Sequence, residues 1–192
     1  LKAGIVALNY VENNVEDSGE ITNCTNEGKI EEQIGSKYYT AGIVADNQNG
    51  NITSCTNNGK IDGKIVGGIA GKSTGYIVAC QNTAEISNLK ENSNDEEFAG
   101  GIVAILETAT IENSKNTGNV IGSTNVGGIV AISFNNCIIN NCEVDIKNGV
   151  LLAERDNENE TIASYGSTIG GIIGRLEHTG NVKGCIVKGN NL

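Results

Sequence analysis

Apolar residues along this chain occur in short runs of four or five positions, separated by stretches rich in Asn and Gly. The most regular run is a Gly-Ile pair followed by a hydrophobic and then a small residue, and it begins at Gly4, Gly42, Gly68, Gly101, Gly128 and Gly171. Blocks this short, bounded by turn residues, are typical of strands and too short for ordinary helices. Repetition of one unit therefore predicts an all-β solenoid whose repeats stack on one another.

The shortest copy of the repeat lies between Gly42 and Gly68, which are 26 residues apart. It contains three short blocks separated by Asn and Gly corners, which predicts three strands per coil. This length exceeds what a compact, three-sided left-handed coil needs, so a right-handed parallel β-helix of about six coils is favoured. Extra residues enter between the blocks, which predicts loop insertions on a constant frame within a single domain, residues 1–192.

A cysteine follows most anchors at a nearly constant distance, and a serine replaces it once. The repeat-equivalent residues are Cys24, Cys55, Cys80, Ser114, Cys142 and Cys185. Equivalent positions in stacked coils lie about 4.8 Å apart, whereas a disulfide needs Cβ atoms about 3.8 Å apart. We therefore predict an internal ladder of free, buried thiols that pack as small hydrophobic groups. Cys137 lies off this ladder, and we expect it to be the accessible thiol.

Other columns recur at a fixed phase to this ladder. Two residues beyond it lies an asparagine in four coils, namely Asn26, Asn57, Asn82 and Asn116. Asparagine side chains cap turn carbonyls, so we predict an inward column with a structural role. Aliphatic columns flank the ladder on both sides, namely Ile21, Ile52, Ile77, Ile111 and Ile139 before it, and Ile30, Ile61, Ile86, Val120 and Ile146 after it. The first column precedes the ladder by three residues, which requires a bend or bulge because side chains alternate along a strand.

The paired glycines of the anchors suit either close approach of two backbones or a positive φ at a corner. They do not form a phosphate-binding loop, because the spacing of such loops and the following helix are missing from the sequence.

The formal charge of −10 argues against nucleic acid and anionic membrane partners, which attract basic patches. The chain contains no apolar run of about 20 residues, the length that spans a bilayer. Neither end carries a polar cap, so we expect a fragment of a longer solenoid.

The only histidine, His178, limits the catalytic chemistry available to this chain. A zinc peptidase needs two histidines on one helix face, and Ser-His or Cys-His catalysis would have to use His178 itself. His178 lies between two strand blocks, and we expect it to be an exposed turn residue. We therefore predict no enzymatic activity and no cofactor.

Carboxylates gather in the insertions of the repeat. They are Glu12, Glu16, Asp17 and Glu20, then Glu91, Asp95, Glu96 and Glu97, and finally Glu154, Asp156, Glu158 and Glu160. Charged loops of this kind are usually solvated. The last cluster concentrates oxygen ligands of the type that Ca²⁺ uses, but it lacks the glycine spacing of an EF-hand or a calcium-binding β-roll. A pair of carboxylates on adjacent coils would be needed to cleave a glycosidic bond, and the sequence shows no convincing pair.

The consensus Gly-Gly-Ile-Val, followed by Ile-x-Asn/Ser-Cys-x-Asn-x-Gly-x-Ile, resembles the GLUG repeat of bacterial cell-surface proteins. The residues from Gly42 to Gly68 and from Gly101 to Gly128 match it best, whereas Val144 and Val187 replace the asparagine in later copies. The resemblance covers nearly the whole chain. It implies large adhesin-like proteins, and also the non-catalytic part of immunoglobulin A1-specific zinc metallopeptidases.

Three functions are consistent with these patterns. The first is a non-catalytic structural or interaction module of a secreted or surface-anchored bacterial protein, located outside the cell. Its partners would be a host or cell-surface protein or glycan, together with flanking domains of the same chain. The second is an accessory module of a secreted zinc peptidase, and the third is a polysaccharide-acting β-helix enzyme. Aromatic residues beside the insertions suit either stacking on a sugar or covering of the loop bases, namely Tyr38, Tyr39, Tyr76, Tyr165 and Phe98.

Overall fold

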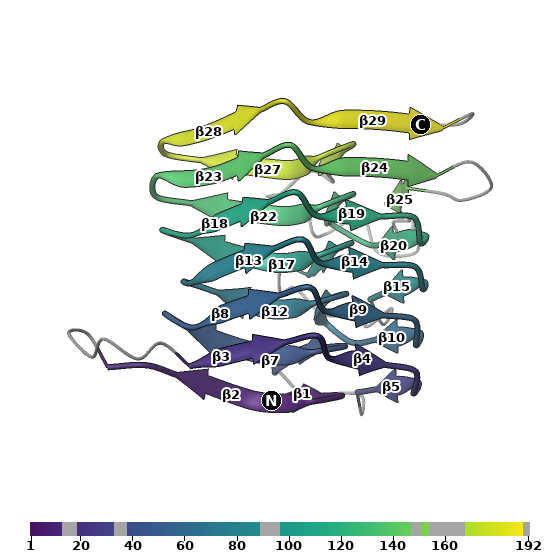
Figure 1. Ribbon diagram of the computed structural model, residues 1–192. Helices are drawn as coiled ribbons and strands as arrows, with labels where there is room; N and C mark the ends of the chain where they lie inside the picture. The colour runs from purple at the N-terminus through teal and green to yellow at the C-terminus, as the bar shows by residue number, and fades with distance from the viewer. Residues whose placement is uncertain (13–18, 33–37, 89–96, 147–150, 154–167, 190–192) are drawn as a thin grey trace.

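The chain folds into a stack of short parallel strands (Figure 1). The computed structural model describes residues 1–12, 19–32, 38–88, 97–146, 151–153 and 168–189. Every strand pairing among these residues is parallel, and they contain no helix. The strands form five sheets that run along the stack. The predicted all-β parallel β-helix is thereby confirmed.

Three sheets, named A, B and C, follow one another along each coil. Sheet A contains β1 (Lys2–Ala3), β6 (Tyr39–Ala41), β11 (Ile65–Gly67), β16 (Phe98–Gly100), β21 (Asn125–Gly127) and β26 (Thr168–Gly170). Sheet B contains β2 (Val6–Tyr10), β7 (Val44–Gln48), β12 (Ala70–Ser73), β17 (Val103–Glu107), β22 (Val130–Phe134) and β27 (Ile173–Glu177). Sheet C contains β3 (Glu20–Thr22), β8 (Asn51–Thr53), β13 (Tyr76–Val78), β18 (Thr110–Glu112), β23 (Cys137–Asn140) and β28 (Gly180–Lys183).

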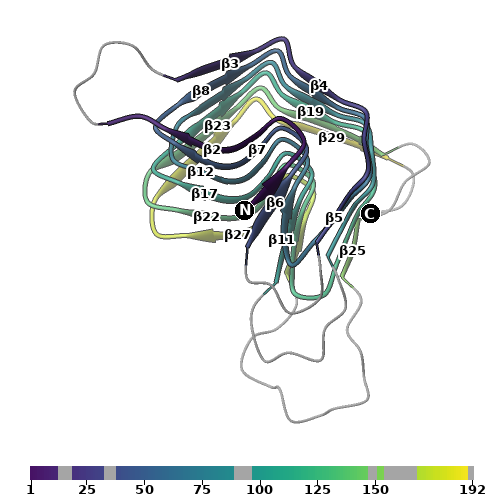
Figure 2. The ribbon, with the colours of Figure 1, turned by 90° about the horizontal axis from the view of Figure 1, so that it is seen from below.

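Two further sheets complete the coil. Sheet D contains β4 (Thr25–Asn26), β9 (Thr56–Asn57), β14 (Gln81–Asn82), β19 (Lys115–Asn116), β24 (Glu143–Ile146) and β29 (Ile186–Gly189). Sheet E contains β5 (Ile30–Glu31), β10 (Ile61–Asp62), β15 (Ile86–Ser87), β20 (Val120–Gly122) and β25 (Leu151–Ala153). We number the coils from the N-terminus, so that the first coil is β1–β5, the second is β6–β10, and the sixth is β26–β29. Viewed along the stack, sheet B lies across from sheet C, and sheet A lies across from sheet E (Figure 2).

The prediction of three strands per coil is wrong, because each complete coil contains five. The paired glycines divide one predicted block into a strand of sheet A and a strand of sheet B. A second block is divided between sheets C and D by a residue with positive φ just before the ladder position. That residue is Asn23, Ser54, Ala79, Asn113, Asn141 or Gly184. It supplies the bend that the spacing of isoleucine and cysteine requires.

The main core contains the aliphatic columns inside the coils. Ile52 pairs in register with Ile21 and Ile77, and all three are buried. The second predicted column is correct over Ile30, Ile61, Ile86 and Val120, but it ends wrongly at Ile146. Leu151 is the register partner of Val120, whereas Ile146 pairs with Gly189 in sheet D. The error arose because an insertion separates β24 from β25, so counting from the ladder stops one strand too early.

The paired glycines owe their place to close backbone approach. A Cβ on Gly100 would lie 1.9 Å from the carbonyl oxygen of Val103, and a Cβ on Gly42 would lie 2.4 Å from the side-chain oxygen of Asn57. Gly184 is the only glycine with positive φ in the described part of the chain. Gly4, Gly42, Gly68 and Gly101 therefore make room for the asparagine column, whereas Gly128 and Gly171 make room for Val144 and Val187.

Candidate functional site

The asparagine column is the most complete polar arrangement in the molecule. The Nδ2 atom of Asn26 donates to Oδ1 of Asn57 at 2.7 Å, Asn57 donates to Asn82 at 2.8 Å, and Asn82 donates to Asn116 at 2.8 Å. Each Nδ2 also donates to the carbonyl two residues later, as Asn82 does to Ala84 at 2.9 Å. Asn26, Asn57 and Asn82 therefore use both amide hydrogens internally, and this column stabilises the turns of neighbouring coils instead of offering a ligand site.

The column changes character in the fifth coil. Val144 is the register partner of Asn116, and Val187 is the partner of Val144. Val144 is fully buried and belongs to the main core. The same position is therefore filled by hydrogen-bonded amides in four coils and by apolar packing in the next two.

The structure places the cysteine ladder residues between sheets C and D. Cys55, Cys80, Ser114 and Cys142 are buried, whereas Cys24 and Cys185 at the ends of the stack are half-buried. All of these thiols are free. Each interior thiol donates to a carbonyl of the preceding coil, as Cys80 does to Ile52 at 3.6 Å.

Burial makes Cys80 and Cys142 poor nucleophiles, whereas a hydrogen bond with the Cys80 thiol lowers the pKa of Cys55 to about 6. Desolvation raises the pKa of Cys142 to about 12. The neighbouring Cys55 thiol, together with burial, raises the pKa of Cys80. Because only a thiolate attacks or binds metal readily, Cys80 and Cys142 have a packing role.

The expectation that Cys137 is accessible is wrong. Cys137 is 2% exposed, and its thiol donates to the carbonyls of Phe134 at 2.9 Å and Leu106 at 3.3 Å. Burial raises the pKa of this thiol as well. Its position aligns with Gly180 in the next coil and lies at the turn from sheet B to sheet C, where the chain faces the core. Cys137 is not part of the cysteine ladder, but its side chain still lies inside the coil.

A second polar column was missed by the sequence analysis. Asn9 donates to Asn47 at 2.9 Å, and Asn47 donates to Ser73 at 3.0 Å and to the carbonyl of Gly50 at 2.9 Å. The column stops where Leu106 occupies the position in the fourth coil. An Asn or Ser before a glycine in consecutive repeats was the available signal, as in Asn47-Gln-Asn-Gly50.

Two carboxylates are buried at the corner between sheets E and A. Glu32 accepts hydrogen bonds from the backbone of Lys64 at 2.9 Å and from the hydroxyl of Thr40 at 3.3 Å. Glu97, which is 3% exposed, accepts a hydrogen bond from Ser123. The interpretation of Glu97 as a solvated loop carboxylate is therefore wrong, because it is tied to the adjacent coil.

Large and small residues alternate at this corner over the first four coils. A Cβ on Gly63 would lie 3.0 Å from Oε2 of Glu32, and a Cβ on Gly122 would lie 3.0 Å from Nδ2 of Asn88. The first and third coils therefore place a long polar side chain above a glycine of the following coil. Glu32 and Asn88 are also the residues after which the chain lengthens before it enters sheet A.

Three of the insertions leave the frame at this one corner. Residues 33–37, 89–96 and 154–167 all lie between a strand of sheet E and the next strand of sheet A, in the first, third and fifth coils. The second coil crosses the same corner with Gly63 and Lys64 alone, and the fourth crosses it with Ser123 and Thr124. The flanking strands of sheets E and A lie along one edge of the stack (Figure 2).

Ion pairs between neighbouring coils occupy many of the described carboxylates. Lys60 lies 2.7 Å from Glu85, Lys72 lies 2.9 Å from Glu107, and Lys115 lies 2.9 Å from Glu143. Hydrogen bonds from lysine lower the pKa of Glu85 and of Glu143. A glycosidase general acid needs the opposite shift, because it must stay protonated near neutral pH.

The remaining predicted residues have varied positions. His178 lies in an exposed turn between β27 and β28 with a φ of 62°. Tyr38 and Tyr76 are exposed, whereas Phe98 is buried, and Tyr165 lies outside the described residues. The carboxylates Glu154, Asp156, Glu158 and Glu160 also lie outside the described residues. Within the described ranges, no group of three or more His, Cys, Asp or Glu side chains is arranged to hold a metal ion.

A second hydrophobic cluster lies outside the main core. It combines residues of sheets A and B, namely Phe98, Ala104, Ala131 and Ile132, with the partly buried Ile65, Ile105 and Phe134. Ala99, the neighbour of Phe98, faces the main core, so alternation places Phe98 on the opposite face of sheet A. This cluster packs the outer angle between the two sheets.

A cavity of about 480 Å³ opens at the N-terminal end of the stack. Its lining comes from the ends of sheets A and E, namely Lys2, Ala3, Lys29, Ile30, Glu31 and Glu32. The Lys29 ammonium pairs with Glu31 and lowers the pKa of that carboxyl. Its charged groups therefore neutralise one another.

Comparison of the chain with protein-family models, with curated proteins and with solved structures finds no match. The part of the chain that the structure describes contains no helix long and apolar enough to cross a membrane.

Proposed function

We propose that this β-helix is a non-catalytic scaffold that displays variable insertions to a binding partner. The observation that carries the proposal is the position of the insertions at residues 33–37, 89–96 and 154–167, which enter from the same corner in alternate coils. The number of residues varies there, while the strands of sheets A and E keep their register across coils with and without an insertion. Loops that vary on a constant frame are where binding specificity is usually placed.

The use of polar groups inside the frame supports a structural role. The asparagine amides bond to one another, the thiols are free and mostly buried, and described carboxylates pair with lysines of adjacent coils. Catalysis would require such groups to be poised toward a substrate. The alternative of a polysaccharide-acting enzyme therefore has less support than a binding module.

The resemblance to the GLUG repeat extends the proposal to a setting. It favours an adhesin-like segment of a secreted or surface-anchored bacterial protein, with a host or cell-surface protein or glycan as partner. The net charge of −10 disfavours nucleic acid. An accessory module of a secreted zinc peptidase would share this fold and differ only in the domains that flank it.

The test is to remove insertions without altering the frame. Residues 89–96, and separately 33–37, would be deleted and the corner rebuilt on the two-residue crossing of the second coil. We expect the thermal midpoint to change little and binding to a glycan array and to immobilised mucin to be lost. Deletion of residues 13–18, which join sheets B and C, is the matched control and should leave binding intact.

Two outcomes would contradict the proposal. Binding that survives deletion of all three corner insertions would place the contacts on the strands. Release of reducing ends from a polysaccharide panel by the intact protein, abolished by a Glu or Asp substitution, would make it an enzyme.

A further inference from the structure

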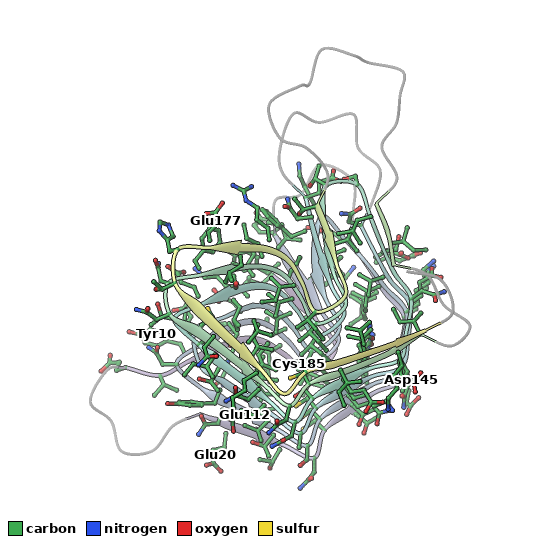
Figure 3. All side chains as sticks on the ribbon, turned by 90° about the horizontal axis from the view of Figure 1, so that it is seen from above. Tyr10, Glu20, Glu112, Asp145, Glu177 and Cys185 are labelled. Carbon is green, nitrogen blue, oxygen red and sulfur yellow. The ribbon has the colours of Figure 1, made fainter. Side chains whose placement is uncertain are left out.

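Two glutamates of the described chain are buried, and both lie at the corner between sheets E and A. Glu32 is 8% exposed and Glu97 is 3% exposed. By contrast, Glu20, Glu112 and Asp145 lie at the periphery of the coil when the molecule is viewed along the stack (Figure 3). Burial of a carboxylate costs free energy unless hydrogen bonds compensate for the lost water. The contacts of these two side chains therefore show what their burial achieves.

Both glutamates flank an insertion. Glu32 immediately precedes residues 33–37, and Glu97 immediately follows residues 89–96. The second and fourth coils cross the same corner without an insertion, and the two residues that make each of these crossings include no carboxylate. The buried glutamates thus accompany two of the three corner insertions.

The carboxylate of Glu32 joins both ends of its insertion to the next coil. Its Oε1 atom accepts a hydrogen bond from the backbone amide of Tyr38, the first residue after the insertion, at 3.3 Å. Its Oε2 atom accepts hydrogen bonds from the backbone amide of Lys64 in the second coil at 2.9 Å and from the hydroxyl of Thr40 at 3.3 Å. One side chain therefore connects the residue before the insertion, the residue after it and the crossing of the next coil.

Glu97 makes a similar connection from the other end of its insertion. Its carboxylate accepts a hydrogen bond from the hydroxyl of Ser123 in the fourth coil. Its backbone amide donates to the hydroxyl of Thr124 at 3.0 Å, and its carbonyl accepts from that hydroxyl at 2.6 Å. The same carbonyl accepts the backbone amide of Asn125 at 3.2 Å. Both insertions are thus tied to the insertion-free coil that follows them.

We propose that Glu32 and Glu97 are positioning residues, which fix the points where these two insertions leave and re-enter the frame. The inference rests on the proposed function, in which the insertions contact a partner. Fixing the ends of a binding loop before the partner arrives reduces the ordering cost of association. The second coil shows that the corner itself can be crossed without a buried carboxylate, so the turn alone does not require one. The working unit is a coil with an insertion together with the coil that anchors it.

The first test measures amide hydrogen exchange by NMR after single contacts are removed. Glu32→Ala should speed exchange at Tyr38 and Lys64, because both amides lose their acceptor. Thr124→Val keeps the shape of the side chain and should speed exchange at Glu97 for the same reason. Exchange in sheets C and D should match that of the wild type.

The second test measures binding of the intact chain to immobilised mucin, at a temperature where circular dichroism shows every variant to be folded. We expect Glu32→Ala and Thr124→Val each to weaken binding by about tenfold, because the ends of an insertion must then be ordered on association. Thr117→Val is the matched control, since it removes a hydroxyl that donates to the Asn82 carbonyl, and it should bind as the wild type does.

A second control separates positioning from general stability. Asn82→Val breaks the asparagine column in sheet D and should destabilise the frame while leaving binding by the folded protein unchanged. The proposal is overturned if Asn82→Val weakens binding as much as Glu32→Ala does, or if neither corner variant weakens binding by the wild type's measure.

Failure of the proposed function would look different. A wild type that binds neither mucin nor a glycan array would contradict that function, and amide exchange would then decide the present inference alone. Faster exchange at Tyr38, Lys64 and Glu97 in the variants would support the two glutamates as the residues that fix the ends of the insertions. Exchange at the wild-type rate would overturn it.

Discussion

Ile69 in the third coil and Ile5 in the first occupy the same place in the repeat, but Ile69 is fully buried and Ile5 is 43% exposed. The same contrast separates Ile111, which is fully buried, from Val182, which is 43% exposed. The sequence of a coil therefore does not by itself decide how much of the coil is buried, because burial also depends on having a neighbouring coil on each side. Stability in such a stack is a sum of coil and interface terms.

The largest difference in stability between an interior and an end position should come from a buried charge. We expect Ile69→Asp to lower the free energy of unfolding by more than about 4 kcal/mol, because an unpaired carboxylate would enter the apolar column. Ile5→Asp should lower it by less than about 1 kcal/mol, since water reaches that position. Denaturant unfolding followed by circular dichroism measures both. Equal midpoints for the two variants would show that the inward assignment of these columns is wrong.

The polar column gives a second contrast between interior and end. Asn82→Val should destabilise by about 3 kcal/mol, because in a buried site it removes the acceptor of one Asn57 amide hydrogen, the side-chain donor to the Ala84 carbonyl and one of the two donors to the Asn116 oxygen. Asn26→Val has one asparagine neighbour instead of two and should cost about 1 kcal/mol. The same unfolding measurement applies. A loss of stability in Asn26→Val as large as in Asn82→Val would mean that the hydrogen bonds between asparagines contribute little. Only the hydrogen bonds from asparagine to the turn carbonyls would then matter.

The bends between sheets C and D are the place where a substitution should increase stability. Ala79 adopts a φ of 54°, which costs a residue with a Cβ about 1 kcal/mol. Ala79→Gly should therefore stabilise by about 0.5–1 kcal/mol, and Gly184→Ala in the sixth coil should destabilise by a similar amount. Thermal midpoints of the pair provide the check. A loss of stability in Ala79→Gly would show that its methyl group packs more than its backbone is strained.

The smallest expected effect concerns the exposed ion pairs between coils. The pKa of Glu143 is lowered in the folded protein by its lysine partners. The stability that this carboxylate contributes is therefore present above its unfolded pKa and is lost as pH falls through its folded pKa. The pKa of its partner Lys115 is raised in the folded protein. The stability that this ammonium group contributes is therefore lost as pH rises through its folded pKa.

Glu143→Gln should therefore lower the thermal midpoint by about 1 °C or less between about pH 5 and about pH 10, with no difference at pH 2. A difference that persists at pH 2 would trace the effect to packing instead of charge.

The interior columns could be predicted because fixed spacing survives insertion. Asn82 and Cys80 lie at nearly the same distance from their anchor as the equivalent residues of other coils. Counting residues from the anchor was therefore enough to predict that each lies in the same column as its equivalents. The five-strand coil could not be predicted in the same way. Asn and Gly, which adopt positive φ readily, make four of the six bends, but Ser54 and Ala79 make the same bend and their types do not predict it.

The polar residues at the corner between sheets E and A show a different limit. Glu97 was predicted to be a solvated loop charge, and Glu32 was not singled out, because the partners of both are a backbone amide and hydroxyl groups of neighbouring coils. Those partners are defined only once the register is known. The insertions were predicted as loops, but their shared corner depends on which sheets they join. The right-handed sense of the coil stays a prediction.

Over the first four coils, the alternation of Glu32 with Gly63 and of Asn88 with Gly122 gives this corner a packing period of two coils. A duplication that copied one coil would set two long side chains on adjacent levels, or leave two glycines with empty space between them. A duplication that copied a pair would preserve the packing and add one more insertion. Over these four coils the packing at the corner therefore repeats every two strand spacings, about 9.6 Å, and each repeat carries one insertion.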